Sequence, residues 1–164
     1  MSRTVGCTFL GRHVWMYDAA LAAWLVALVD CLEADPDLLV RFDGLVAQAR
    51  RTAALGSSSV FDPGDHLDPE DVRAFVDIAR HVSNAAREGG PIDWERFASR
   101  AILDDLPPVT RAHRPSVEDV AAVGEAFVGI ADGTFPPPPN HTWWFVGSPG
   151  GRTTIPMRPE APPG

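Results

Sequence analysis

Apolar residues through most of the chain recur every three to four positions, the spacing of amphipathic helices. A first helix is predicted over 16–33. Its run 19–29 is apolar on every side, which favours a position in the centre of the fold. A second helix is predicted from Asp35, an N-cap residue followed by proline, to Leu55. Residues 56–67 are rich in serine, glycine, proline and aspartate and predict a loop.

Three more helices are predicted beyond this loop. The first begins at Asp68, taken as an N-cap, and ends at Gly89. A shorter helix is predicted over 93–105, and the last begins at the N-cap Ser116 and ends at Gly133. The apolar stripes of the first and last of these helices place two aromatic residues in the core, Phe75 and Phe127.

β structure is predicted at both ends of the chain. Val5, Cys7 and Phe9 alternate with smaller residues and predict a short strand buried on one face, whereas 142–146 and 152–155 predict a hairpin. Isolated hairpins are only marginally stable, so we expect both elements to meet in one small sheet. The fold class expected is mainly α: about five helices in a compact bundle, with a short N-terminal strand and a C-terminal β-hairpin forming a small sheet.

The length of 164 residues predicts one globular domain over 1–156, followed by a disordered, proline-rich tail over 157–164. The longest apolar run has 11 residues, and a transmembrane helix needs about 20. Two cysteines without a metal-binding or disulfide pattern indicate a reducing compartment. We therefore expect a cytoplasmic protein, with Cys31 serving as a small apolar residue on a helix packing surface.

Acidic residues dominate the charge, with 22 Asp and Glu against 14 basic residues and a net charge of −8. This balance argues against nucleic acid and against anionic membranes as partners. Almost all of the excess lies in residues 61–125, which hold 14 acids against seven arginines. Such a patch can steer a basic protein partner; the alternative is that these acids serve a helix start and keep the protein dissolved.

The predicted partner-binding residues combine this acidic run with the tryptophan pair of the C-terminal hairpin. Adjacent residues of a strand point to opposite faces, so one of the two tryptophans is a candidate exposed anchor. The predicted set is Asp62, Asp65, His66, Glu70, Asp71, Trp143 and Trp144.

The chain contains no recognisable arrangement of nucleophile, base and orienting group, and no cofactor or metal site is predicted. The spacing of three residues between acids in the run does not match an EF-hand loop. The expected function is therefore protein binding, as in an immunity or antitoxin-like inhibitor or a regulatory accessory factor. The alternative is a small-molecule-binding protein or enzyme with a pocket between the helices and the terminal sheet, lined by His13, Tyr17, His141 and Trp143.

Overall fold

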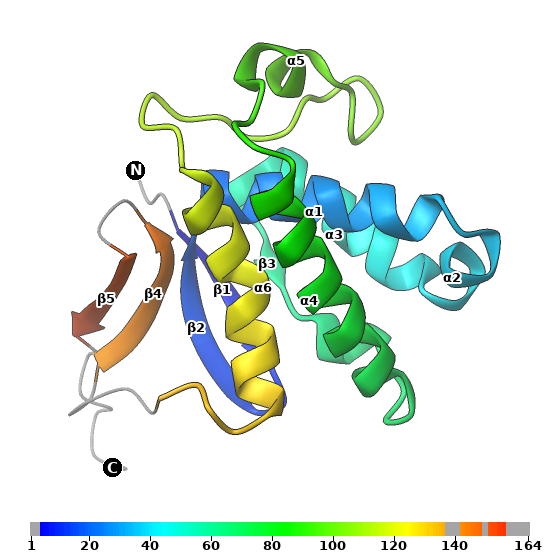
Figure 1. Cartoon of the computed structure of the whole chain (residues 1–164), viewed down its shortest axis with the longest axis vertical. Helices are drawn as coiled ribbons and strands as arrows, with labels where there is room; N and C mark the ends of the chain where they lie inside the picture. Colours follow the sequence, from blue (N-terminus) through cyan, green and yellow to red (C-terminus); the bar gives the residue numbers. More distant parts are fainter. Residues whose placement is uncertain (1–3, 137–141, 149–150, 157–164) are drawn as a thin grey trace, which may run out of the picture.

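The computed structural model describes residues 4–136, 142–148 and 151–156. These residues form an α/β fold in which six α-helices pack with a mixed five-stranded sheet (Figure 1). In chain order the strands and α-helices are β1 (Thr4–Phe9), β2 (Arg12–Tyr17), α1 (Asp18–Glu33), α2 (Pro36–Arg41), α3 (Asp43–Leu55), β3 (Val60–Phe61), α4 (Asp71–Glu88), α5 (Trp94–Ser99), α6 (Val117–Ala131), β4 (Thr142–Ser148) and β5 (Gly151–Pro156).

The sheet has the strand order β3-β1-β2-β4-β5. β1 and β2 form an antiparallel hairpin, β4 pairs in parallel with β2, and β5 returns antiparallel to β4. The predicted meeting of the N-terminal strand and the C-terminal hairpin in one sheet is therefore confirmed. The sheet is nevertheless larger than predicted, so the fold is α/β, and the expected mainly helical bundle was only partly right.

Two strands were missed by the sequence prediction. β2 follows β1 through a two-residue turn in which both Leu10 and Gly11 have positive φ, 48° and 74°, as a type I′ hairpin turn requires. Leucine rarely adopts this conformation, so the turn has no sequence signal of the usual Asn-Gly kind. β3 consists of two residues that pair in parallel with Gly6 and Cys7, inside the predicted loop.

Three helix boundaries also differ from the prediction. The predicted helix 35–55 is two helices, α2 and α3, separated at Phe42, whose side chain is buried. α4 begins at Asp71, because the backbone N–H of Asp71 donates to the carbonyl of Asp68 and closes a turn there. Asp68 is therefore not the N-cap. α5 covers only Trp94–Ser99, and the chain beyond it is irregular.

The last helix was predicted correctly. Ser116 caps α6 in a reciprocal arrangement, in which its hydroxyl accepts from the N–H of Asp119 and the Asp119 carboxylate accepts from the N–H of Ser116. Such a capping box satisfies two backbone donors that the helix leaves unpaired.

An aromatic core joins the sheet to the helices. Its members are Phe9, Trp24, Phe61, Phe75 and Phe127. The side chain of each is at most 1% exposed. The Phe127 ring lies 5.4 to 5.8 Å from each of the other four ring centroids. The predicted burial of Phe75 and Phe127 is confirmed, as is the buried face of β1 formed by Val5, Cys7 and Phe9.

α4 and α6 lie side by side and are in close contact at Gly124 (Figure 1). A Cβ atom on Gly124 would lie 2.1 Å from the Ser83 hydroxyl oxygen and 2.8 Å from the Ala79 carbonyl oxygen, so only glycine fits. The buried Ser83 hydroxyl donates to the Ala121 carbonyl and accepts from the Trp24 indole N–H. Among the described residues, no helix has the length and apolar character that crossing a membrane requires.

Candidate functional site

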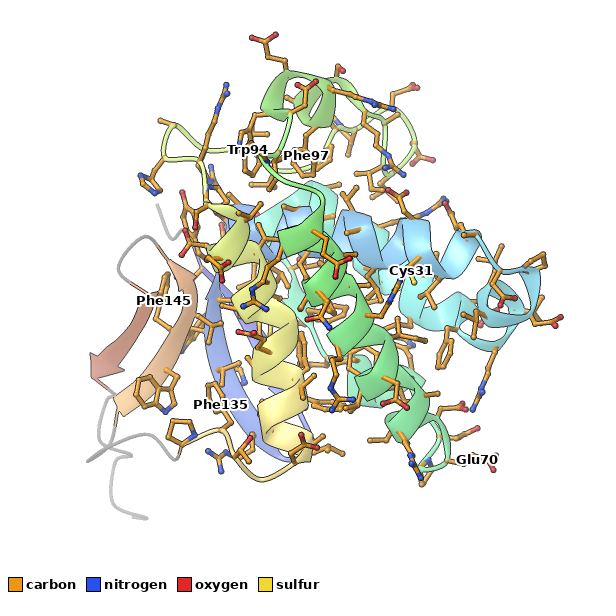
Figure 2. All side chains as sticks on the ribbon, in the orientation of Figure 1. Cys31, Glu70, Trp94, Phe97, Phe135 and Phe145 are labelled. Carbon is orange, nitrogen blue, oxygen red and sulfur yellow. The ribbon has the colours of Figure 1, made fainter. Side chains whose placement is uncertain are left out.

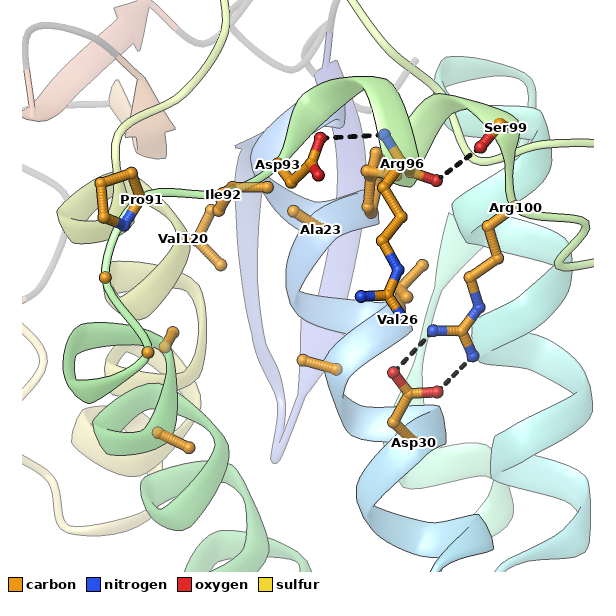
Figure 3. A pocket seen from close by; sticks show the side chains of 16 residues that line it. Ala23, Val26, Asp30, Pro91, Ile92, Asp93, Arg96, Ser99, Arg100 and Val120 are labelled. Carbon is orange, nitrogen blue, oxygen red and sulfur yellow. Dashed lines mark hydrogen bonds and ion pairs between the residues drawn. The ribbon is translucent and has the colours of Figure 1, made fainter.

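A groove lies between α1, the C-terminal end of α4 and the segment that carries α5 (Figure 3). Its volume is about 690 Å³, which falls within the usual range for small-molecule sites. We call it the α1–α5 groove. Its apolar lining comes from α1, α4, α5, α6 and the loop before α5, and it includes Ala23, Val26, Ala27, Ile92, Phe97 and Val120.

The local sequence explains why space is left here. α4 ends at Glu88 with Gly89 as its C-cap, and Gly90 follows with a φ of 72°, which turns the chain away from the helix axis. The Asp93 carboxylate then accepts from the backbone N–H of Arg96, 3.0 Å away, and starts α5. Alanines on α1 and α4 form part of the lining, and their short side chains leave the gap between the elements open.

Arg100 connects the segment that carries α5, on one side of the groove, to α1 on the other side. Its guanidinium makes a two-pronged ion pair with the Asp30 carboxylate, with Nη1 2.6 Å from Oδ2 and Nη2 bound to Oδ1 (Figure 3). The hydrogen bonds that Arg100 donates to the Asp30 carboxylate raise the pKa of Arg100 above its ordinary value. Both charges are therefore already matched within the protein.

Arg96 extends from α5 toward α1 beside Arg100 (Figure 3). Unlike Arg100, its guanidinium makes no ion pair with any residue that the structure describes. Asp93, also on the groove lining, uses its carboxylate to cap α5. The groove thus combines an apolar lining with one arginine, Arg96, that makes no ion pair with a described residue. The only hydroxyl among the described lining residues is that of Ser99, and it donates to the Arg96 carbonyl. The arrangement is therefore suited to binding a ligand.

The acidic residues predicted from sequence lie at the opposite end of the molecule's long dimension from α5, where Glu70 marks the tip (Figure 2). Two of them serve the fold. The Asp62 carboxylate accepts from the backbone N–H of Thr8 at 2.8 Å, and Asp71 accepts from the Arg41 Nε at 2.7 Å. Asp65, His66 and Glu70 are exposed.

The structure separates the acidic run from the tryptophan pair. Asp62 follows β3, whereas Trp144 belongs to β4, and β1 and β2 lie between these strands. Three strand spacings amount to about 14 Å. Trp144 is half-buried, and its indole N–H donates to the Pro136 carbonyl at 2.8 Å. Trp143 lies in β4, but its side chain is outside the described part of the chain.

Of the residues predicted for the alternative pocket, only His13 and Tyr17 have side chains in the described part of the chain, so the pocket as a whole stays a prediction. His13 and Tyr17 lie four residues apart on β2, about 13 Å along the strand. The buried Tyr17 hydroxyl donates to the His113 carbonyl, and His13 Nδ1 lies 2.9 Å from the Thr8 hydroxyl oxygen. His141 is outside the described residues. The space between helices and sheet holds the aromatic core, and the groove is on another side of the helices.

The titratable groups near the sheet owe their shifted pKa values mainly to burial. Burial raises the pKa of the Cys7 thiol well above its ordinary value, and the nearby Asp62 carboxylate adds to this shift. Burial lowers the pKa of His13, and the Asp62 charge acts in the opposite direction without outweighing it. Cys31 is half-buried against the core, and its pKa is also raised by burial.

Sequence reasoning missed the groove and its arginines. The one local signal is the Gly89-Gly90-Pro91 break before a short capped helix. The Asp30–Arg100 pair joins residues 70 positions apart, which no local pattern indicates. No group of three or more metal-ligating side chains is present among the described residues. Comparison with known proteins found no matching family model, no similar curated protein and no similar solved structure.

Proposed function

We propose that this protein binds a small organic molecule in the α1–α5 groove. The observation that carries the proposal is a groove of about 690 Å³ with a mainly apolar lining and few charged groups. Known ligand pockets share this size and this combination of apolar walls with a few polar groups. The floor is rigidly placed, since Ala23, Val26 and Val120 belong to long helices and are less than 9% exposed.

The test uses N-phenyl-1-naphthylamine, a neutral apolar dye whose fluorescence rises when it leaves water. We expect saturable binding of one dye per chain to the wild-type protein. Ala27→Phe places a large ring on the groove lining and should weaken dye binding about tenfold or more. Ala98→Phe adds the same ring to an exposed position of α5 that does not line the groove, and it should leave binding unchanged. Equal dye binding by all three proteins would refute the proposal.

A second candidate function is binding of a basic protein through the acidic end, as expected of an inhibitor or a regulatory accessory factor. It is favoured by the exposed carboxylates of Asp65, Asp68 and Glu70, which make no ion pair with any described residue. Uncompensated charges of one sign accelerate association with an oppositely charged partner.

The experiment measures association rates with a basic protein recovered by affinity purification, at low and physiological salt. Asp65→Asn combined with Glu70→Gln should slow association several-fold at low salt and flatten its salt dependence. Asp104→Asn combined with Asp105→Asn removes the same charge from exposed positions in another part of the chain. Equal slowing by both pairs would attribute the effect to net charge and would exclude a specific acidic surface.

A further inference from the structure

Four charged side chains also line the groove, and they differ in whether they have a partner. Of its two acidic side chains, Asp30 has both carboxylate oxygens bound to Arg100, and Asp93 caps α5. Of its two guanidinium groups, Arg100 is held by Asp30, whereas Arg96 has no anionic partner among the described residues. Among the four charged side chains of the lining, only Asp30 and Arg100 therefore form an ion pair, and the Arg96 guanidinium and the Asp93 carboxylate each lack an oppositely charged partner among the described residues.

We propose that the ligand is an amphipathic organic monoanion, whose carboxylate pairs with Arg96 and whose apolar body lies against the α1 residues of the lining, Ala23, Val26 and Ala27. This inference rests on the proposed function of the groove. A guanidinium presents parallel N–H donors that match the two oxygens of a carboxylate, and the alanines leave room for an alkyl or aryl chain beside it.

The charge of the ligand follows from the same arrangement. Arg100 is not free to accept a second anionic group, since Asp30 already occupies its two-pronged face. A dianion would place its second charge near Asp30 or Asp93 without a cation to match it. With a net charge of −8, the protein as a whole repels anions, so recognition depends on the local pair with Arg96.

The experiment compares two competitors that share one alkyl chain, decanoate and its neutral analogue decanamide. Each is used to displace N-phenyl-1-naphthylamine from the wild-type protein. We expect decanoate to compete about five- to tenfold better than decanamide, the range of a partly exposed charged hydrogen bond. Arg96→Gln should reduce this ratio to about one while leaving displacement by decanamide unchanged.

A control variant makes the result specific to Arg96. Arg73→Gln removes an exposed arginine of α4 that does not line the groove and causes the same change in net charge. It should retain the preference for decanoate.

The outcomes separate this inference from the proposed function. If the dye binds and Ala27→Phe abolishes binding, but decanoate and decanamide compete equally, the groove binds ligands and the anion inference is wrong. An unchanged preference in Arg96→Gln also overturns the inference. If the dye does not bind in the groove at all, the proposed function itself fails, and the anion inference falls with it.

Discussion

The aromatic core and the segment that carries α5 are built on different physical principles. The core rings contact one another and are fully buried. Residues 90–116, which we call the strap, connect α4 to α6, and α5 within it has no fully buried residue. Trp94 and Phe97 lie on the side of α5 that faces the helices (Figure 2), where they are only half-buried.

Polar contacts hold much of the strap in place. Arg100 binds Asp30, Arg111 binds Asp18, and the Val109 N–H donates to the Ala53 carbonyl at 2.7 Å. Regions with few buried apolar contacts open at lower free-energy cost than a packed core. The groove lies between α1 and the strap, so one of its sides belongs to a long buried helix and the other to this polar-anchored segment.

The largest difference between the two regions should appear when a ring is removed from each. Phe127→Ala should lower the free energy of unfolding by about 3–5 kcal/mol, because it leaves a cavity among four other rings. Phe97→Ala should cost about 1 kcal/mol, since the half-buried ring can be replaced by water. Urea unfolding followed by circular dichroism measures both values. Equal losses would show that the strap is packed as tightly as the core.

The second difference concerns the two ion pairs of the strap. The Asp18 side chain is fully buried at the start of α1, with Arg111 Nε 3.1 Å from its Oδ2, whereas Asp30 and Arg100 are both substantially exposed. Arg111→Gln should cost about 2–3 kcal/mol, because it leaves a buried carboxylate without its partner. Arg100→Gln should cost at most about 1 kcal/mol.

A double variant checks the reason for the Arg111 effect. Asp18→Asn combined with Arg111→Gln removes both charges and should recover part of the lost stability in the same unfolding assay. If the double variant is less stable than Arg111→Gln alone by the full cost of Asp18→Asn, the two side chains act independently and the buried pair does not anchor the strap.

The same contrast explains what could be predicted from the sequence. The all-round apolar run of α1, the N-cap of α6 at Ser116 and the burial of Phe75 and Phe127 are encoded by local spacing, and all were predicted correctly. β2 shows alternation too, with Val14 and Met16 buried. However, β2 runs directly into the apolar start of α1, so the end of the strand was included in the predicted helix over 16–33.

The remaining features depend on contacts between distant residues. β3 has only two residues, and it is a strand only because β1 pairs with it. The groove forms where Asp30 of α1 lies beside Arg96 and Arg100 of the strap, and apolar periodicity does not specify this arrangement. The acidic run was visible in the sequence, but the pairing of Asp71 with Arg41 and of Asp62 with the Thr8 N–H was not.

The smallest expected effect tests the sheet side of the core through pH. Partial burial lowers the pKa of His13, with the Asp62 charge opposing this shift without outweighing it, so the unfolded chain binds a proton more readily at this residue than the folded protein does. Folding stability is therefore unaffected by His13 at pH 8. It decreases as the pH falls through about 6.5, the ordinary value for histidine, toward the lower folded pKa.

His13→Gln cannot titrate, so its unfolding free energy should decrease less than that of the wild type between pH 7.5 and pH 5.5. The other histidines and the carboxylates are common to both proteins and cancel in this comparison, which urea unfolding at the two pH values measures. A larger decrease in the variant would mean that protonated His13 is stabilised in the folded state, with Asp62 outweighing burial.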